Sequence, residues 1–320
     1  MNVADLSGPG IDEFVLKHLA DWHIETLTDI QSKAVQSGVA AGNSMIVSAP
    51  TSSGKTLIGE IAILSALRSG SRAIYLVSHR ALADQKYVDF VARFGERSAD
   101  PLASVGLDTG DRSEGDIDAQ LVVATYEKAF GLILTGQLKP ENALVVADEL
   151  QILGDPSRGP EIETLCAIFR QRGLKQFVAL TATVENAADL AGWMRCDLVY
   201  SSHRDVPLHQ EIWYEDSVYR TTFGHDTGSP INDRAASSTE VMNVVGRLLK
   251  LNCGPVLVFT ESRGEAMRYA EEFGKSRPRA SEGLVLAEQL DLFSEPTESS
   301  EQLRGTARVN TFETPGSIIY

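Results

Sequence analysis

An eight-residue stretch of small and polar residues near the start of the chain constrains its fold more than any other feature. It reads Ala49, Pro50, Thr51, Ser52, Ser53, Gly54, Lys55 and Thr56. Residues 44–48 before it are typical of a short buried strand, and residues 57–67 after it are typical of a helix. A strand, a tight turn and a helix form the setting of a phosphate-binding loop, whose backbone N–H groups and helix N-terminus face phosphate. The lysine would bind the β- and γ-phosphates of a nucleotide, and the threonine hydroxyl after it would bind Mg²⁺.

Short apolar segments alternate with helical segments over the following 150 residues or so. Strands are predicted at residues 72–78, 121–126, 143–148, 176–183 and 197–201. Continuous apolar strands separated by helices predict an α/β fold, with a parallel sheet covered by helices on both faces. Ligands of such sheets bind beyond the carboxyl ends of the strands, which is where polar residues gather in this sequence.

Asp148 and Glu149 end the apolar run at residues 143–147. Together with a phosphate-binding loop, an acidic residue at the end of a buried strand commonly completes a Mg²⁺ site, so Asp148 is the candidate ligand. Glu149 could orient the attacking water and remove its proton. Gln31 lies 24 residues before Lys55 and could bind an adenine edge through its amide, although a glutamine on the solvent side of a helix fits the sequence equally well.

The pattern changes after residue 204. A strand is predicted at 208–214, a Gly- and Ser-rich linker at 224–238, and then a helix at 241–251, a strand at 255–260 and a helix at 265–273. The pattern weakens after residue 275, where an amphipathic piece at 284–293 is the main feature. The sequence therefore predicts one α/β domain at residues 1–204, an inter-domain segment at 205–240, and the first part of a second such domain at 241–320.

The composition of the chain restricts its possible functions less than the motifs do. The net charge of −15 argues mildly against nucleic acid as a partner, but a local set of cations and hydrogen-bond donors is sufficient to bind phosphates. No apolar run approaches the roughly 20 residues that span a bilayer. The three cysteines form no metal or disulfide pattern, and the N-terminus shows no secretory signal, so we expect a cytoplasmic protein.

Taken together, the order and spacing of the motifs resemble the DExH branch of the superfamily 2 helicases, closest to its Ski-type and repair-type members. Residues 49–56 are similar to this family's version of the phosphate-binding loop, including the alanine at its start, and residues 148–151 are similar to its DExH box. Further segments that resemble its motifs are residues 80–83, 109–111, 125–128, 158–159, 181–183, 206–208 and 258–263.

The resemblance implies a RecA-like fold, ATP and Mg²⁺ as ligands, and a single strand of DNA or RNA as the partner. By the same resemblance Gln31 would bind adenine, and residues 51–56 would hold the phosphates and Mg²⁺. The residues implied to grip the nucleic-acid strand are Arg80, Thr109, Gly110 and Thr125. Thr181 and Thr183 would link the state of ATP to movement along the strand, and the resemblance implies movement in the 3′ to 5′ sense.

Three departures from the family pattern bear on activity. Gln151 stands where the family has His; it can still hydrogen-bond to the coupling residues but cannot change charge. Thr181 replaces Ser and keeps the hydroxyl. We find no counterpart of the late motifs that carry the arginine finger, which is worth about 10³–10⁵ in rate, so we expect the chain to be part of a longer helicase.

Two other functions remain open from the sequence. The chain could bind ATP and nucleic acid without turnover, since the arginine finger is missing. It could also be a phosphate-loop ATPase that acts on protein, which its pI of 4.9 would suit. The motifs do not separate DNA from RNA, because contacts to phosphates carry little information about base or sugar.

Overall fold

The computed structural model describes residues 2–204, 209–214, 217–222, 230–231, 241–250, 256–260 and 262–276. The chain divides into two compact units, Met1–Val206 and Pro207–Tyr320. The finer division into residues 1–204, 205–240 and 241–320 stays a prediction.

The first unit is built on a sheet that has eight strands within the described residues, in the order β4-β3-β5-β2-β6-β7-β1-β8. Neighbouring strands pair in parallel throughout, except for β3 and β4 at one edge. The predicted α/β fold with a RecA-like parallel sheet is therefore confirmed, with one short antiparallel strand added. The strands are β1 (Met45–Ser48), β2 (Ala73–Val77), β3 (Val105–Asp108), β4 (Ser113–Glu114), β5 (Leu121–Thr125), β6 (Leu144–Ala147), β7 (Gln176–Thr181) and β8 (Asp197–Tyr200).

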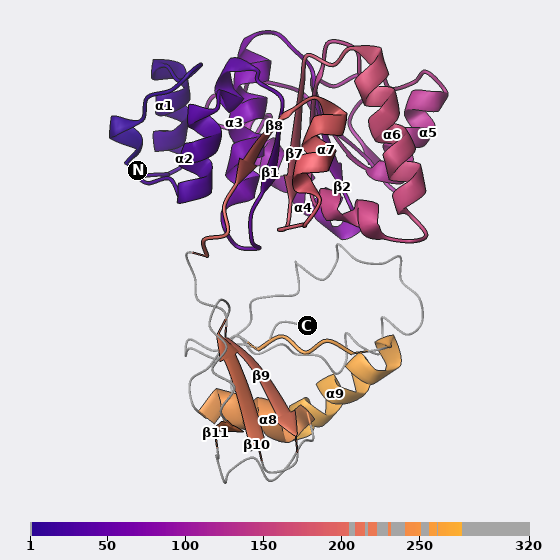
Figure 1. Ribbon diagram of the computed structural model, residues 1–320. Coiled ribbons are helices and arrows are strands. Elements are labelled where there is room, and N and C mark those ends of the chain that lie inside the picture. The colour runs from indigo at the N-terminus through magenta and orange to yellow at the C-terminus, as the bar shows by residue number, and fades with distance from the viewer. Residues whose placement is uncertain are drawn as a thin grey trace. The chain divides into compact units, whose positions relative to one another are not determined.

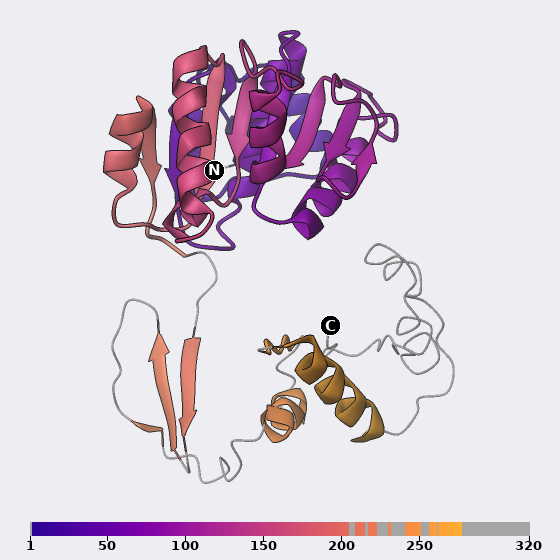
Figure 2. The same cartoon turned by 90° about the vertical axis from the view of Figure 1, so that its right-hand side faces the viewer.

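Helices cover both faces of this sheet (Figures 1 and 2). One buried cluster joins the sheet to α1 (Glu13–Asp21), α2 (Asp29–Gln36), α3 (Lys55–Arg68) and α4 (Arg80–Arg93). A second cluster joins the opposite face to α5 (Tyr126–Leu134), α6 (Gly159–Arg172) and α7 (Ala187–Met194). Three short 3₁₀ turns complete the unit: η1 (Val3–Asp5), η2 (Val39–Ala41) and η3 (Leu150–Gly154).

Strand β6 shows why the central strands are apolar without alternation. Leu144 and Val146 pack into the first cluster, whereas Val145 and Ala147 pack into the second. Successive side chains of a strand point to opposite faces, so a strand with helices on both sides buries all of them. All four of these residues have no exposed surface.

Two strands of the first unit were not predicted from the sequence. Strand β3 contains Gly106 and ends at Asp108, and β4 is only two residues long, so neither presents the apolar run of a central strand. Strand β4 forms the edge of the sheet and β3 lies next to it, where burial is incomplete. The other predicted strands of this unit are present, each within two residues of the expected bounds at either end.

In the described part of the second unit, an antiparallel sheet of three strands has the order β11-β10-β9, formed by β9 (His209–Tyr214), β10 (Ser217–Thr222) and β11 (Pro230–Ile231). Helices α8 (Val241–Lys250) and α9 (Arg263–Ser276) lie where helices were predicted. The strand predicted at 255–260 is wrong for residues 257–260, which have no regular structure. Most of the predicted linker at 224–238, and all of the piece at 284–293, lie outside the described residues. In the described part of the chain, no helix is long and apolar enough to cross a membrane.

Candidate nucleotide and nucleic-acid sites

The carboxyl ends of the parallel strands meet along one edge of the sheet, and the candidate residues follow them. The loop at residues 49–54 follows β1, Ser78 follows β2, and Asp148 and Glu149 follow β6. Thr125 and Thr181 are the last residues of β5 and β7. Residues as far apart in sequence as Ala49 and Thr181 are thereby placed along one edge.

The turn between β1 and α3 needs unusual backbone angles. Gly54 has φ of 80° and Ser52 has φ of 65°, both in the left-handed region. A Cβ atom at Gly54 would lie 2.3 Å from Nε2 of Gln31, so only glycine fits that position. Ser53 is buried and donates its hydroxyl to the Pro50 carbonyl at 2.8 Å, which fixes the turn from inside.

Lys55 begins α3 and folds back over this loop. Its Nζ donates to the carbonyl oxygens of Ala49 and Pro50, both at 2.8 Å. Burial lowers the pKa of Lys55, and the negative charges of Asp148 and Glu149 act in the opposite direction. The ammonium group is thus held at the loop by two neutral acceptors, which a charged phosphate could replace.

Gln31 is buried against the same loop instead of lying on a solvent-exposed helix face. Its Nε2 donates to the Gly54 carbonyl and its Oε1 accepts from the backbone N–H of Thr28, each at 2.8 Å. Thr28 in turn donates to the Ser53 carbonyl at 3.0 Å. Contact of Gln31 with adenine stays a prediction, and its amide retains one N–H and one oxygen lone pair beyond these two hydrogen bonds.

Asp148 lies at the centre of a buried set of hydrogen bonds. Its Oδ2 accepts from the phenol of Tyr75 at 2.7 Å, and its Oδ1 accepts from the backbone N–H of Glu149 at 3.0 Å. Tyr126 donates its phenol to the Asp148 carbonyl at 2.7 Å. Burial raises the pKa of Asp148, and the bond from Tyr75 partly offsets this effect.

Glu149 has a left-handed backbone with φ of 54°, and its Oε2 accepts a hydrogen bond from the Ser78 hydroxyl. Strand β2, which ends before Ser78, lies next to β6 on the side away from β7 and β1. The Glu149 side chain is therefore bonded to the neighbour that is farther from the phosphate-binding loop. The sequence places Ser78 in a polar cluster at the end of a predicted strand, but Ser78 was not among the predicted site residues.

The loop also contacts a residue that the sequence analysis did not select. Arg204 donates from Nη2 to the hydroxyl of Thr51 at 2.7 Å. It follows β8, which pairs with β1 at the end of the sheet. The order of the strands, which sequence reasoning did not establish, is what brings this cation to the loop.

Gln151 makes the contact predicted from the sequence. Its Oε1 accepts from the hydroxyl of Thr181 at 3.3 Å and from the backbone N–H of Ala182 at 2.9 Å. The turn η3 after β6 is thereby tied to the end of β7. Thr183, the other predicted coupling residue, is exposed.

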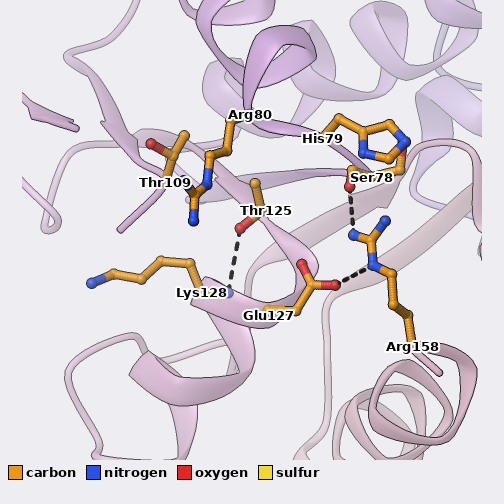
Figure 3. A pocket seen from close by; sticks show the side chains of 8 residues that line it. All are labelled: Ser78, His79, Arg80, Thr109, Thr125, Glu127, Lys128 and Arg158. Carbon is orange, nitrogen blue, oxygen red and sulfur yellow. Dashed lines mark hydrogen bonds and ion pairs between the residues drawn. The ribbon is translucent and has the colours of Figure 1, made fainter. Parts of the chain in front are cut away.

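A pocket of about 570 Å³ lies at the same edge, beyond the ends of β2 and β5 (Figure 3). It brings together three of the four residues implied to grip a nucleic-acid strand: Arg80, Thr109 and Thr125. The fourth, Gly110, is not among the lining residues, and its backbone N–H donates to Asp108 at 3.0 Å. The remaining lining residues are Ser78, His79, Glu127, Lys128 and Arg158.

The three permanent cations that line this pocket are each paired with a carboxylate. Arg80 contacts Asp111, Lys128 lies 3.4 Å from Asp108, and Arg158 donates from Nε to Glu127 at 2.7 Å. Any phosphate entering the pocket would compete with these acids for the cations. Three cations therefore line one pocket of a chain whose net charge is −15, but their charge is largely balanced by carboxylates.

The donor set at the loop and at β6 fits Mg²⁺ with a bound nucleotide. Mg²⁺ takes oxygen ligands and is commonly held by one or two carboxylates together with substrate phosphates. Thr56 and Asp148 offer a hydroxyl and a carboxylate. Among the described residues no group of three His, Cys, Asp or Glu side chains could hold a metal by itself.

A parallel sheet with a phosphate-loop turn after β1 and an acidic pair after β6 defines the chain as a RecA-like α/β protein. The DEAD/DEAH box helicase family matches residues 28–190, and the chain belongs to this family. This result confirms the resemblance drawn from the motifs.

Several curated relatives match beyond the family region. The ATP-dependent DNA helicase Hel308 of Pyrobaculum calidifontis is 36% identical over 293 residues, which cover 89% of this chain and 38% of the relative. The proteins of the same name from Aeropyrum pernix and Methanocella arvoryzae are 35% and 33% identical, over 77% and 85% of this chain. The chain spans about a third of the length of these relatives, 32–38%.

Proposed function

We propose that this chain binds and hydrolyses ATP and uses the energy to move along, or unwind, DNA. The observation that carries the proposal is the placement of a phosphate-binding turn, a buried acidic pair and a cation-lined pocket along one edge of one sheet. The names of the relatives favour DNA over RNA as the nucleic acid. The three-cysteine composition without a disulfide pattern supports a cytoplasmic location.

At the nucleotide site, the N–H groups of residues 51–56 and the Lys55 ammonium would bind the phosphates. Thr56 and Asp148 would hold Mg²⁺, which neutralises phosphate charge and orients the oxygens when it is bound. Glu149 would accept a proton from the attacking water, and Gln31 would contact adenine. The phenols of Tyr75 and Tyr126 support the proposed Mg²⁺-binding role of Asp148, because they fix the positions of its carboxylate and its backbone carbonyl.

At the strand site, Arg80, Thr109 and Thr125 would bind successive phosphates, with Gly110 close to them. Gln151, Thr181 and Thr183 would transmit changes at the nucleotide to this edge of the sheet. The bonds from Gln151 to β7 support such a path, since they join the segment after the acidic pair to the next strand toward the loop.

A chain that binds both ligands without turnover is the second candidate. The lack of a recognisable arginine-finger motif in the sequence favours it, because the missing cation would then come from a further segment or partner. ATP binding without hydrolysis, in the presence of single-stranded DNA, would select this candidate over the first. An ATPase that acts on protein is less consistent with the family.

The variant Glu149→Gln tests the assignment of the base. It should bind ATP as the wild type does and lose hydrolysis by about 10²–10⁴-fold, the usual contribution of a general base. Glu163→Gln is a matched control, because Glu163 is exposed on α6, which packs on the face opposite to α3. Normal turnover by Glu149→Gln would contradict the proposed role of this carboxylate.

A further inference from the structure

Ser78 lies between the two sites and contacts groups on both sides. Its hydroxyl donates to Oε2 of Glu149, and its carbonyl oxygen accepts from Nη2 of Arg158. Arg158 is also bonded through Nε to Glu127, which lines the pocket (Figure 3). Ser78 is 3% exposed, so water does not compete freely for these contacts. A continuous set of hydrogen bonds therefore runs from Glu127 through Arg158 and Ser78 to Glu149.

The side of β6 on which Ser78 lies matters for hydrolysis, because it determines where the Glu149 carboxylate is held. The phosphate-binding loop follows β1, which is two strands from β6, with β7 between them. Ser78 follows β2, which adjoins β6 on the opposite side. A carboxylate bonded to Ser78 is thus drawn toward the pocket side of the sheet and away from the strand that carries the loop.

We infer that Ser78 holds Glu149 in a resting position, and that a nucleic-acid phosphate in the pocket releases it. Ser78 is a positioning residue in this scheme, and the inference rests on the proposed function. The chemical partner is a phosphodiester, which can bind a guanidinium through two hydrogen bonds and carries the charge to compete with Glu127 for Arg158. Movement of Arg158 removes the partner of the Ser78 carbonyl and loosens the end of β2.

Coupling between two binding sites is reciprocal, so this scheme has one consequence for DNA affinity and one for the rate of hydrolysis without DNA. If a nucleic-acid strand weakens the contact between Ser78 and Glu149, then removal of that contact must strengthen binding of the strand by the same factor. Coupling between sites in proteins is typically 5- to 150-fold. The contact also lowers turnover in the absence of the strand, so its loss must raise that basal rate.

The test compares the wild type with Ser78→Ala, Ser78→Thr and Ser98→Ala in the 320-residue chain. Ser78→Thr keeps the hydroxyl and serves as the rescue variant. The Ser98 hydroxyl bonds to the backbone of Asp100, and Ser98 does not line the pocket, so Ser98→Ala serves as the matched control. ATP hydrolysis is measured with and without a single-stranded DNA oligonucleotide, and the affinity for that oligonucleotide is measured without nucleotide.

We expect Ser78→Ala to raise the DNA-free kcat about 5-fold or more without changing KM for ATP, and to bind the oligonucleotide about 5-fold or more tightly. The stimulation of hydrolysis by DNA should fall accordingly. Ser78→Thr and Ser98→Ala should behave as the wild type. A merely structural role for Ser78 would lower kcat or stability and would not strengthen DNA binding.

The outcomes separate the inference from the proposed function. If the wild type shows DNA-stimulated, Lys55-dependent hydrolysis but Ser78→Ala has the same basal rate and DNA affinity, the inference is overturned and the function stands. If the wild type binds DNA without turning over ATP, the proposed turnover fails, and the DNA affinity of Ser78→Ala alone decides the inference. A wild type that does not bind the oligonucleotide overturns both.

Discussion

The phenol of Tyr75 donates a 2.7 Å hydrogen bond to Oδ2 of Asp148. Tyr75 is completely buried on β2, and Asp148 follows the neighbouring strand β6. The bond fixes the orientation of the carboxylate that we propose as a Mg²⁺ ligand. It also favours the ionised carboxylate, against the effect of burial, which raises the pKa of Asp148.

Tyr75→Phe should therefore lower the stability of the folded chain by about 1.5–3 kcal/mol, the usual contribution of a hydrogen bond to a charged group. It should also raise the pKa of Asp148 further. As the pH is lowered, Asp148 should then become protonated earlier, so Mg²⁺-dependent hydrolysis should begin to fall at a higher pH than in the wild type. Tyr126→Phe is the matched control, because Tyr126 is equally buried but donates to the backbone carbonyl of Asp148. If the low-pH side of the pH–rate profile shifted equally in Tyr75→Phe and Tyr126→Phe, this account would be contradicted.

Glu60 on α3 should make stability depend on pH near neutrality. Burial raises the pKa of Glu60 from 4.5 to about 7, against the effect of Arg93, with which it forms an ion pair. Because the folded-state pKa lies above the unfolded one, the stabilising contribution is fully present below pH 4.5 and is lost as the pH rises through about 7. The wild type should lose about 3 kcal/mol over that window relative to Glu60→Gln.

Urea unfolding at several pH values measures this difference directly. Glu96→Gln is a suitable control, since Glu96 is exposed beyond the end of α4. A stability difference between the wild type and Glu60→Gln that stays constant from pH 4.5 to 7 would show that Glu60 titrates as an ordinary carboxyl.

Gln151 offers a test of coupling that is separate from hydrolysis. Gln151→Ala removes the acceptor of Thr181 and Ala182, and should cost about 1 kcal/mol of stability while leaving ATP binding intact. We expect strand displacement to fall more than hydrolysis does. Gln151→Glu keeps an acceptor oxygen at the same place and should retain more of the coupling. Parallel loss of both activities in Gln151→Ala would argue against a coupling role.

The central sheet and the turn between β1 and α3 could be predicted largely from the sequence, because both depend on local patterns. Each buried strand forms a short apolar run, and the phosphate-binding turn requires Gly54 at a positive φ. Strand β3, which lies next to the edge strand β4, was missed because Gly106 and Asp108 interrupt its apolar pattern. The hydrogen bond that Gln151 accepts from Thr181 was predicted because the family resemblance identified both residues as parts of interacting motifs.

Contacts between distant segments could not be predicted in the same way. Ser78 and Glu149 are 71 residues apart, and only the adjacency of β2 and β6 brings them together. Arg158 reaches Glu127 across 31 residues, and Arg204 reaches Thr51 across 153. These pairs depend on strand order and on side-chain direction, for which a single sequence carries no local signal.

Arg80→Ala tests the pocket as a phosphate site. The variant should bind single-stranded DNA of any sequence more weakly, and the slope of log affinity against log salt should fall in magnitude by about 0.7, the value for one phosphate contact. Arg172→Ala is the control, because Arg172 is a similarly paired arginine at the end of α6 that does not line the pocket. An unchanged slope in Arg80→Ala would exclude Arg80 from phosphate binding.

Removing the partner of Arg80 gives the complementary result. Asp111 is exposed and forms an ion pair with Arg80. Asp111→Asn frees the guanidinium, so DNA affinity should stay the same or rise. A loss of affinity in Asp111→Asn would indicate that Asp111 itself, and not Arg80, contributes to binding.

ATP hydrolysis by the 320-residue chain, with and without single-stranded DNA at low salt, tests the central claim most directly. We predict hydrolysis that rises with DNA and is abolished in Lys55→Ala, because the Lys55 ammonium at the loop is the proposed phosphate ligand. Single-stranded RNA of the same length tests the preference for DNA. Hydrolysis that persists in Lys55→Ala, or that does not respond to nucleic acid while ATP is bound, would contradict the account of this chain as a DNA-dependent ATPase.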